Sequence, residues 1–131
     1  MTDEFKIEII NPDQLFYSNE NIFEAVIPAF EGEIGILKDH ISIISFLKPG
    51  IIKLKLNNSS EETFYVEDGI IEFKDNSLSI LTSNIVDLKK TSKDYFDKSL
   101  KEAQKILEDT ELSDQERFLN SQKVDTLKSL N

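Results

Sequence analysis

The feature that most constrains the fold is a two-residue alternation of apolar and polar side chains, repeated in short runs. Residues 5–9 read Phe-Lys-Ile-Glu-Ile, and residues 52–56 read Ile-Lys-Leu-Lys-Leu. In residues 23–27, the same spacing predicts Phe23, Ala25 and Ile27 on one face. A period of two places one face of a strand on a core and the other in water.

Turn signals separate these runs at short intervals and contain Gly, Pro, Asn or Asp, which fix a turn or tolerate a positive φ. They include Asn11-Pro12-Asp13, Glu31-Gly32, Pro49-Gly50, Asp68-Gly69 and Asp75-Asn76. Many short strands with closely spaced turns favour an antiparallel β-sandwich or barrel. Because no helical stretch lies between the strands, a parallel βαβ sheet is disfavoured. We expect the core shared by the two sheets to contain Phe46, Leu47, Ile70, Ile71 and Phe73.

The sequence changes character near Asn84, where Lys, Asp, Glu, Ser and Leu replace Val, Ile and aromatic residues. Over 92–109, the apolar side chains Phe96, Leu100, Ala103 and Leu107 recur at helical spacing and predict an amphipathic helix. Tyr95 and Ile106 widen this stripe on one side.

A second helix is predicted after Ser113, because Ser113-Asp114-Gln115-Glu116 has the capping-box pattern. Its apolar side chains spread over a wide arc. The connection between the helices is short, which favours an antiparallel pair. The predicted organisation is therefore a β-sandwich domain over 1–84 and a helical hairpin domain over 85–131. Each helix alone is marginal in water, so the pair must pack on something.

Charge excludes one class of partner. The net charge is −10, which opposes binding to nucleic acid because phosphates require clustered Lys and Arg. Residues 1–84 carry 15 acidic and 6 basic side chains, whereas residues 85–131 carry 10 and 9. The two parts therefore have different surfaces, which suggests different partners. An acidic protein can still dock on a basic partner.

Several kinds of site and segment are missing from the sequence. With no Cys and one histidine, His40, disulfides, thiolate sites and multi-histidine metal sites are excluded, so no metal is predicted. No apolar run approaches a membrane span, and the first residues resemble neither a secretory signal nor a transit peptide. We expect the chain to stay where it is made.

Catalytic motifs are also missing. There is no phosphate-binding glycine loop and no nucleophile elbow. Glu31 and Glu33 share a face at strand spacing, but paired surface carboxylates are most often solvated charges. His40 could act as a general base, yet a lone histidine in a loop is more often a turn or interface residue. The sequence therefore favours a protein-binding role over catalysis.

Residues 28–40 read Pro-Ala-Phe-Glu-Gly-Glu-Ile-Gly-Ile-Leu-Lys-Asp-His, a run that resembles the signature of the epsilon subunit of F-type ATP synthases. Three further segments are similar to that family and follow in its order: 46–52, 66–73 and 78–82. The similarity covers residues 5–90, and the hairpin sits where the family has one. The resemblance implies a β-sandwich with a C-terminal helical hairpin and a non-catalytic role.

The resemblance also implies partners. The sandwich would lie against the gamma subunit and touch the polar loops of the c-ring in the central stalk, coupling ion flow to ATP synthesis. By position, Glu33 corresponds to the ring contact and His40 to the gamma contact, and Glu31 is a further expected partner-contact residue. The C-terminal helices would fold on the sandwich, or extend along gamma toward the alpha and beta subunits and regulate hydrolysis. The expected location is the cytoplasmic face of the inner membrane, peripheral and only indirectly membrane-bound.

Nucleotide binding is a separate question. Some family members bind ATP through an Ile/Leu-Asp-x-x-Arg-Ala motif. Here the matching stretch keeps Asp87 but has Lys90 in place of Arg and Thr91 in place of Ala. Lys loses the planar bidentate fork of Arg. Asp87 and Lys90 are therefore weak nucleotide candidates, and no cofactor is predicted.

Two alternative functions remain open. The first is an independent β-sandwich adaptor or sugar-binding module, although a chain with no Trp and three Tyr is poor in stacking platforms. The second is an enzyme that uses surface carboxylates. It would require a carboxylate with a strongly raised pKa in a cleft.

Overall fold

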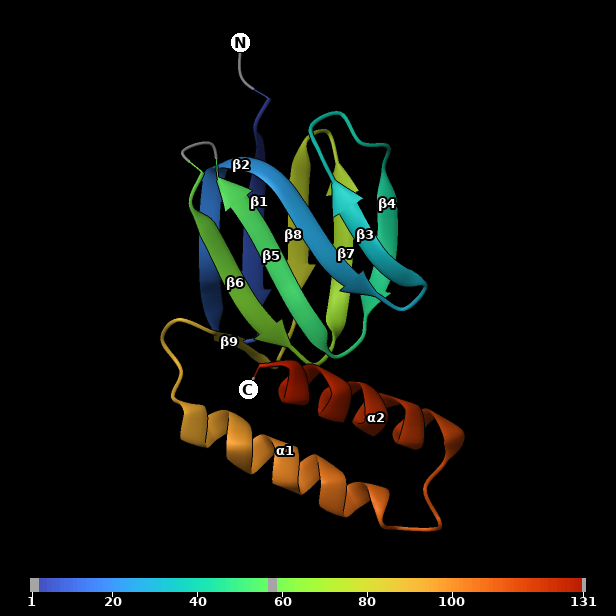
Figure 1. The fold of residues 1–131 in the computed structure, drawn as a ribbon. Helices are drawn as coiled ribbons and strands as arrows, with labels where there is room; N and C mark the ends of the chain where they lie inside the picture. Colours follow the sequence, from blue (N-terminus) through green and yellow to red (C-terminus); the bar gives the residue numbers. More distant parts are fainter. Residues whose placement is uncertain (1–2, 57–58, 131) are drawn as a thin grey trace.

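The computed structural model describes residues 3–56 and 59–130. In these ranges the chain forms a β-sandwich above a pair of helices (Figure 1). The strands and helices are β1 (Phe5–Asn11), β2 (Gln14–Ala29), β3 (Gly32–Ile36), β4 (Ile43–Leu47), β5 (Gly50–Leu56), β6 (Glu61–Val66), β7 (Gly69–Lys74), β8 (Ser77–Leu81), β9 (Ile85–Asp87), α1 (Lys93–Leu107) and α2 (Asp114–Ser129).

The sandwich has two layers joined by the long strand β2. One layer has the strand order β1-β8-β7-β4, and the other has β3-β2-β5-β6-β9. The first half of β2 pairs with β1, and its second half pairs with β3 and β5. The predicted β-sandwich is confirmed, with one difference. β1 and β8 pair in parallel, since they come from distant parts of the chain and not from a hairpin.

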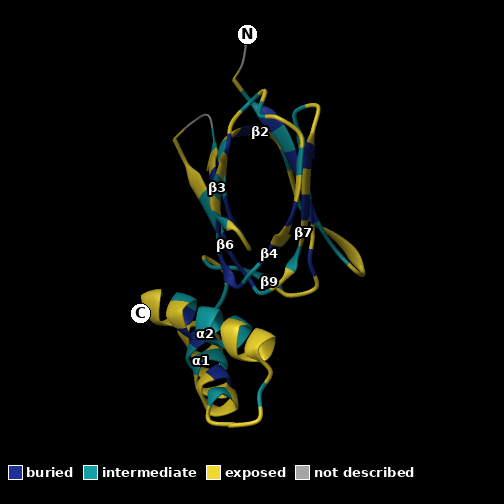
Figure 2. Cartoon of the chain, turned by 90° about the vertical axis from the view of Figure 1, so that its right-hand side faces the viewer, coloured by how far each residue is buried: buried dark blue, intermediate teal, exposed yellow. Residues whose placement is uncertain are grey.

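The main core fills the space between the two layers. Figure 2 shows the buried positions on the inner sides of the facing strands. The alternation predicted for residues 5–9 and 52–56 is confirmed, because Phe5, Ile7, Ile9, Ile52 and Leu54 are all buried. Inward-facing Phe64 contacts two further aromatic rings, Phe16 in an edge-type arrangement and Tyr17 in a tilted one.

Three side chains expected in the core are exposed. Phe46 and Ile70 are 60% and 42% exposed, because Leu47 and Ile71, their neighbours along the strands, point inward. Phe23 is 42% exposed. The pairing of β2 with β5 shifts register between Ile22 and Glu24, which inserts an extra residue and reverses the alternation. The predictions that Phe46, Ile70 and Phe23 face the core are therefore wrong. For Phe46 and Ile70, the reason is the strict alternation of inward and outward side chains along a strand.

Both helices begin as the sequence predicts. Ser92 caps α1 by accepting a hydrogen bond from the backbone N–H of Tyr95. The capping box of α2 is complete, since Ser113 and Glu116 each accept from the backbone of the other. The two helices run side by side in opposite directions beneath the sandwich (Figure 1), which confirms the hairpin.

The hairpin is attached to the sandwich by a second, smaller core. Buried Tyr65, Phe96 and Leu127 meet there, from β6, α1 and α2 respectively. Helix α2 lies between α1 and the lower end of the sandwich (Figure 2). Strand pairing continues past the predicted domain boundary at Asn84, because β9 pairs with β6 through Val66 and Ile85.

Candidate functional site

The acidic turn, residues 30–33, joins β2 to β3 and carries the two carboxylates singled out from the sequence. Glu31 lies in the turn and Glu33 lies on β3 opposite Pro28, and both are exposed. Gly32 has a φ of +135°, a backbone conformation that residues with a side chain rarely adopt. The sequence therefore folds locally so that two carboxylates flank a glycine turn at an edge of the sandwich.

The Glu31 carboxylate is held from inside the sandwich. Ser45 of β4 is only 4% exposed, and its hydroxyl donates a hydrogen bond to Glu31 Oε2 at 2.8 Å. This bond, followed by that from the backbone N–H of Glu31 itself, lowers the pKa of the Glu31 carboxyl. No signal in the sequence singles out Ser45, because the contact depends on β4 lying beside the turn.

The same turn contacts the hairpin. The ring of Phe30 stacks on the ring of Phe118 from α2, with 5.9 Å between their centroids. The backbone N–H of Phe30 donates to the carbonyl of Phe46 at 3.0 Å, which fixes the turn against β4. The acidic turn is therefore bounded by β4 on one side and by α2 on another.

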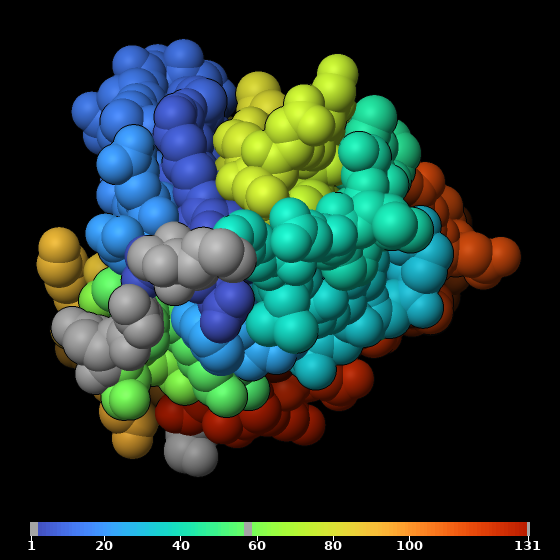
Figure 3. All heavy atoms as spheres, turned by 90° about the horizontal axis from the view of Figure 1, so that it is seen from above, coloured from blue at the N-terminus to red at the C-terminus, as the bar shows by residue number. Residues whose placement is uncertain are grey.

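The loop between β3 and β4, which carries His40, lies at the end of β3 away from the acidic turn (Figure 1). The Nδ1 of His40 is 2.8 Å from the carbonyl oxygen of Ile41, and its ring meets Phe73 edge-on. The adjacent Asp39 exchanges hydrogen bonds with Asn76. Viewed from above, the loop near residue 40 and the turn near residue 75 touch (Figure 3). The structure does not bring His40 together with the two carboxylates.

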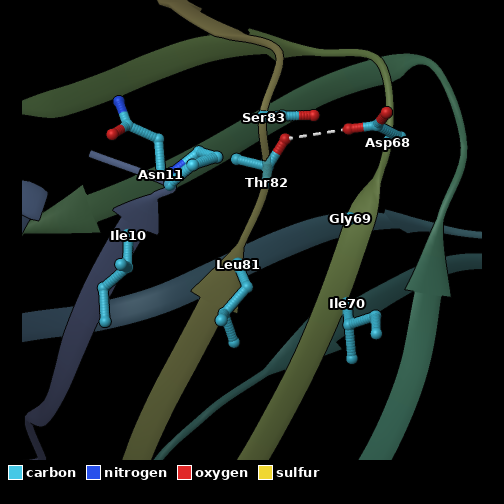
Figure 4. A pocket seen from close by; sticks show the side chains of 9 residues that line it. Ile10, Asn11, Asp68, Gly69, Ile70, Leu81, Thr82 and Ser83 are labelled. Carbon is cyan, nitrogen blue, oxygen red and sulfur yellow. Dashed lines mark hydrogen bonds between the residues drawn. The ribbon is translucent and has the colours of Figure 1, made fainter. Parts of the chain in front are cut away.

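An apolar row crosses the outer face of the β1-β8-β7-β4 layer. Strand register places its members directly opposite one another, and Figure 4 shows three of them side by side. The row consists of Phe46 on β4, Ile70 on β7, Leu81 on β8, Ile10 on β1 and Leu15 on β2. All but the half-buried Ile10 are exposed, as is Ile44 on β4. Such a contiguous patch is typical of a protein interface.

A pocket of about 500 Å³ adjoins the apolar row, and Ile10, Ile70 and Leu81 of the row help to line it. Polar groups form its rim, where Asp68 accepts a hydrogen bond from Thr82 Oγ1 at 3.3 Å (Figure 4). This combination of an apolar floor and a polar rim suits a protein side chain better than a reacting small molecule.

The weak nucleotide candidates lie beside a separate groove of about 350 Å³ between the sandwich and the start of the hairpin. Asp87 and Lys90 line it together with Phe16, Tyr17 and Thr91. Oδ1 of Asp87 accepts a hydrogen bond from the backbone N–H of Lys89 at 2.9 Å, so that oxygen is already engaged within the local turn.

Residues 3–56 and 59–130 contain neither a metal-binding cluster of side chains nor a membrane-spanning helix. No three Asp, Glu or His side chains there are grouped so as to hold a metal ion. Neither described helix has the length and apolar character needed to cross a membrane.

Comparisons with known proteins agree with one another. Residues 4–87 match the family model described as ATP synthase, Delta/Epsilon chain, beta-sandwich domain. The ATP synthase epsilon chain of Pelagibacter ubique is 55% identical over 131 residues, which is the whole of both chains. That of Nitratiruptor is 31% identical and covers 81% of each chain.

The fold also matches a chain in the structure of the Euglena gracilis mitochondrial ATP synthase with OSCP, F1 and the c-ring. The TM-score is 0.77 at 19% identity, covering 99% of this chain and 81% of that one. The chain therefore belongs to the family of ATP synthase epsilon chains, non-catalytic subunits of that complex.

Proposed function

We propose that this chain joins the gamma subunit to the c-ring in the central stalk, with a different surface for each partner. The apolar row would dock on gamma, and the acidic turn would meet the polar loops of the ring. The observation that carries the proposal is the apolar row itself. Four strands of one layer, with the first half of β2, present opposed apolar side chains to solvent, a surface that a subunit buried in a complex would cover.

The exposed side chains of the apolar row suit a contact with gamma. Phe46 and Leu81 are more than half exposed, and burying them against a partner is favourable in proportion to the apolar area removed from water. The adjoining pocket can receive one apolar side chain, and an anchor seated in a pocket typically dominates binding energy. His40 is half-buried against Phe73, which supports a role in shaping the loop at the upper end of the sandwich.

The charge of the acidic turn suits a contact with the ring. The acidic turn exposes Glu31 and Glu33 within a domain that is strongly acidic, so a loop carrying Lys or Arg would be attracted to it. The hairpin carries nearly balanced charge and offers a separate surface for the alpha and beta subunits. In this arrangement the chain is peripheral, at the cytoplasmic face of the inner membrane.

The test is a titration of the purified chain into ATP synthase depleted of its own epsilon chain, with ATP hydrolysis followed throughout. One-to-one binding at submicromolar concentration is expected. Lower hydrolysis at saturation would assign an inhibitory role to the hairpin, whereas unchanged hydrolysis would leave it structural. The absence of binding at micromolar concentrations, with both components folded, would refute the proposal.

A matched pair of variants tests the gamma surface. Ile70 in the apolar row and Ile106 on α1 are both 42% exposed. Ile70→Gln should weaken binding about tenfold or more, since interface anchors commonly cost over 1 kcal/mol when removed. Ile106→Gln leaves the apolar row intact, so it should weaken binding less than Ile70→Gln does. Equal effects of the two variants would place the gamma contact elsewhere.

A further inference from the structure

We infer that Ser45 is a positioning residue, whose buried hydroxyl holds the Glu31 carboxylate in place for a cationic side chain of the partner. The inference rests on the proposed ring contact and adds to it a distinction between the two acids. Glu31, and not Glu33, is the carboxylate arranged in advance of binding.

The first step is the geometry of the hydrogen bond. On β4, Ser45 points inward between Ile44 and Phe46, which point outward. It is the only Ser among the buried residues that the structure describes. The 2.8 Å bond to Glu31 therefore joins a side chain fixed by strand packing to an exposed side chain of the turn.

The second step is the contrast with Glu33. No hydrogen bond or ion pair involves the Glu33 side chain within the described residues, so no polar contact there holds its carboxylate. Ordering a long acidic side chain on binding costs conformational entropy. At Glu31, part of this conformational entropy is already lost when the chain folds, because Ser45 holds one carboxylate oxygen while the carboxylate stays exposed.

The third step is chemical. Ser45 donates to Oε2, and the carboxylate stays exposed, so a donor from outside can still reach it. A carboxylate fixed through one oxygen presents the other in a defined direction, and hydrogen bonds between charged groups depend strongly on direction. The fitting ligand is therefore a Lys or Arg side chain on a polar loop of the partner.

The experiment compares dissociation constants of full-length variants for the epsilon-depleted ATP synthase. Removing one charge-assisted contact typically costs a factor of about ten, so Glu31→Gln should bind about tenfold more weakly. Ser45→Ala should bind about three- to tenfold more weakly. Ser45→Thr keeps the hydroxyl and suits a strand, so it should restore most of the affinity. Glu33→Gln removes the same charge from a carboxylate that Ser45 does not hold, so it should weaken binding less than Glu31→Gln does.

The double variant separates positioning from packing. If Ser45 acts through Glu31, Ser45→Ala should have no further effect in the Glu31→Gln background. A full additional loss in that background would overturn the inference, as would wild-type affinity of Ser45→Ala. A larger effect of Glu33→Gln than of Glu31→Gln would also overturn it. In all three cases the wild-type chain binds and the proposed function stands, whereas failure of the wild type itself to bind refutes the proposed function.

Discussion

The ring of Phe118 on α2 stacks on the ring of Phe30 in the acidic turn, with 24° between the ring planes. This contact lies far along α2 from the second core, where Leu127 meets Tyr65. A third contact lies at the same end of α2 as Leu127, because Thr126 Oγ1 donates a hydrogen bond to the carbonyl of Pro49. The hairpin is therefore held at two ends, and one of those ends is the turn that carries Glu31.

Phe118→Ala should loosen the first turns of α2. A stacked aromatic pair contributes about 1 kcal/mol beyond its buried area, so backbone amides of α2 should exchange with solvent about five times faster. Hydrogen exchange of the full chain measures this directly. Phe23→Ala removes a ring of similar exposure from the sandwich and should leave exchange in α2 unchanged. Equal protection of α2 in all three proteins would show that the Phe30 contact does not hold the hairpin.

Alkaline pH should release the hairpin through Tyr65. Its ring is buried and its hydroxyl donates to Glu67 Oε2 at 3.0 Å. Burial, followed by the nearby Glu67 charge, raises the pKa of Tyr65 above the ordinary value of 10.0. Because the folded pKa is the higher one, Tyr65 stabilises the fold fully below about pH 10, and this contribution is lost as pH rises further.

The measurement is the free energy of unfolding between pH 8 and 11, for which Tyr65→Phe is the test variant. At pH 8 the variant should be less stable by about 1 kcal/mol, since one hydrogen bond is lost. Its stability should then fall less steeply above about pH 10 than that of the wild type. The same alkaline slope in both proteins would assign the loss to other groups.

The sequence predicts the elements well because each depends on local signals. The capping box at Ser113 and the stripe of α1 need no tertiary information. The wide apolar arc of α2 is explained by its position between α1 and the sandwich, which requires contacts on more than one side. The exposed positions of Phe46 and Ile70 could have been inferred from strict alternation along their strands.

The candidate site is less accessible to sequence reasoning. Glu31 and Glu33 are found because a short motif contains both, and the structure places them on one turn. The contacts of Ser45 and Phe118 with the acidic turn could not be predicted from the sequence, since they arise when distant segments pack together. His40 lies near in the sequence but far in space, because the whole of β3 separates it from the turn.

Ser45→Ala should raise the pKa of Glu31 toward its ordinary value of 4.5. The Ser45 hydrogen bond is the largest cause of the lowered pKa, and it stabilises the charged form. A carboxyl with a lowered folded pKa contributes stability above its unfolded pKa, and the contribution is lost as pH falls through the folded value. NMR titration of the side-chain carboxyl measures the shift, and Ser45→Thr should keep the lowered pKa. An unchanged titration in Ser45→Ala would assign the lowering to the backbone.

Alanine at Gly69 should cost more stability than alanine at Gly32, although both glycines have a positive φ. At Gly32, with φ +135°, an added Cβ meets no atom within 4 Å, so only backbone strain applies, on the order of 1–2 kcal/mol. At Gly69, with φ +144°, it would lie 2.4 Å from the backbone oxygen of Leu81, which brings the expected cost to about 3–5 kcal/mol. Urea unfolding of both variants gives the comparison. Equal costs would mean that β8 moves away from β7 without penalty, in which case the close approach of these strands does not constrain the apolar row.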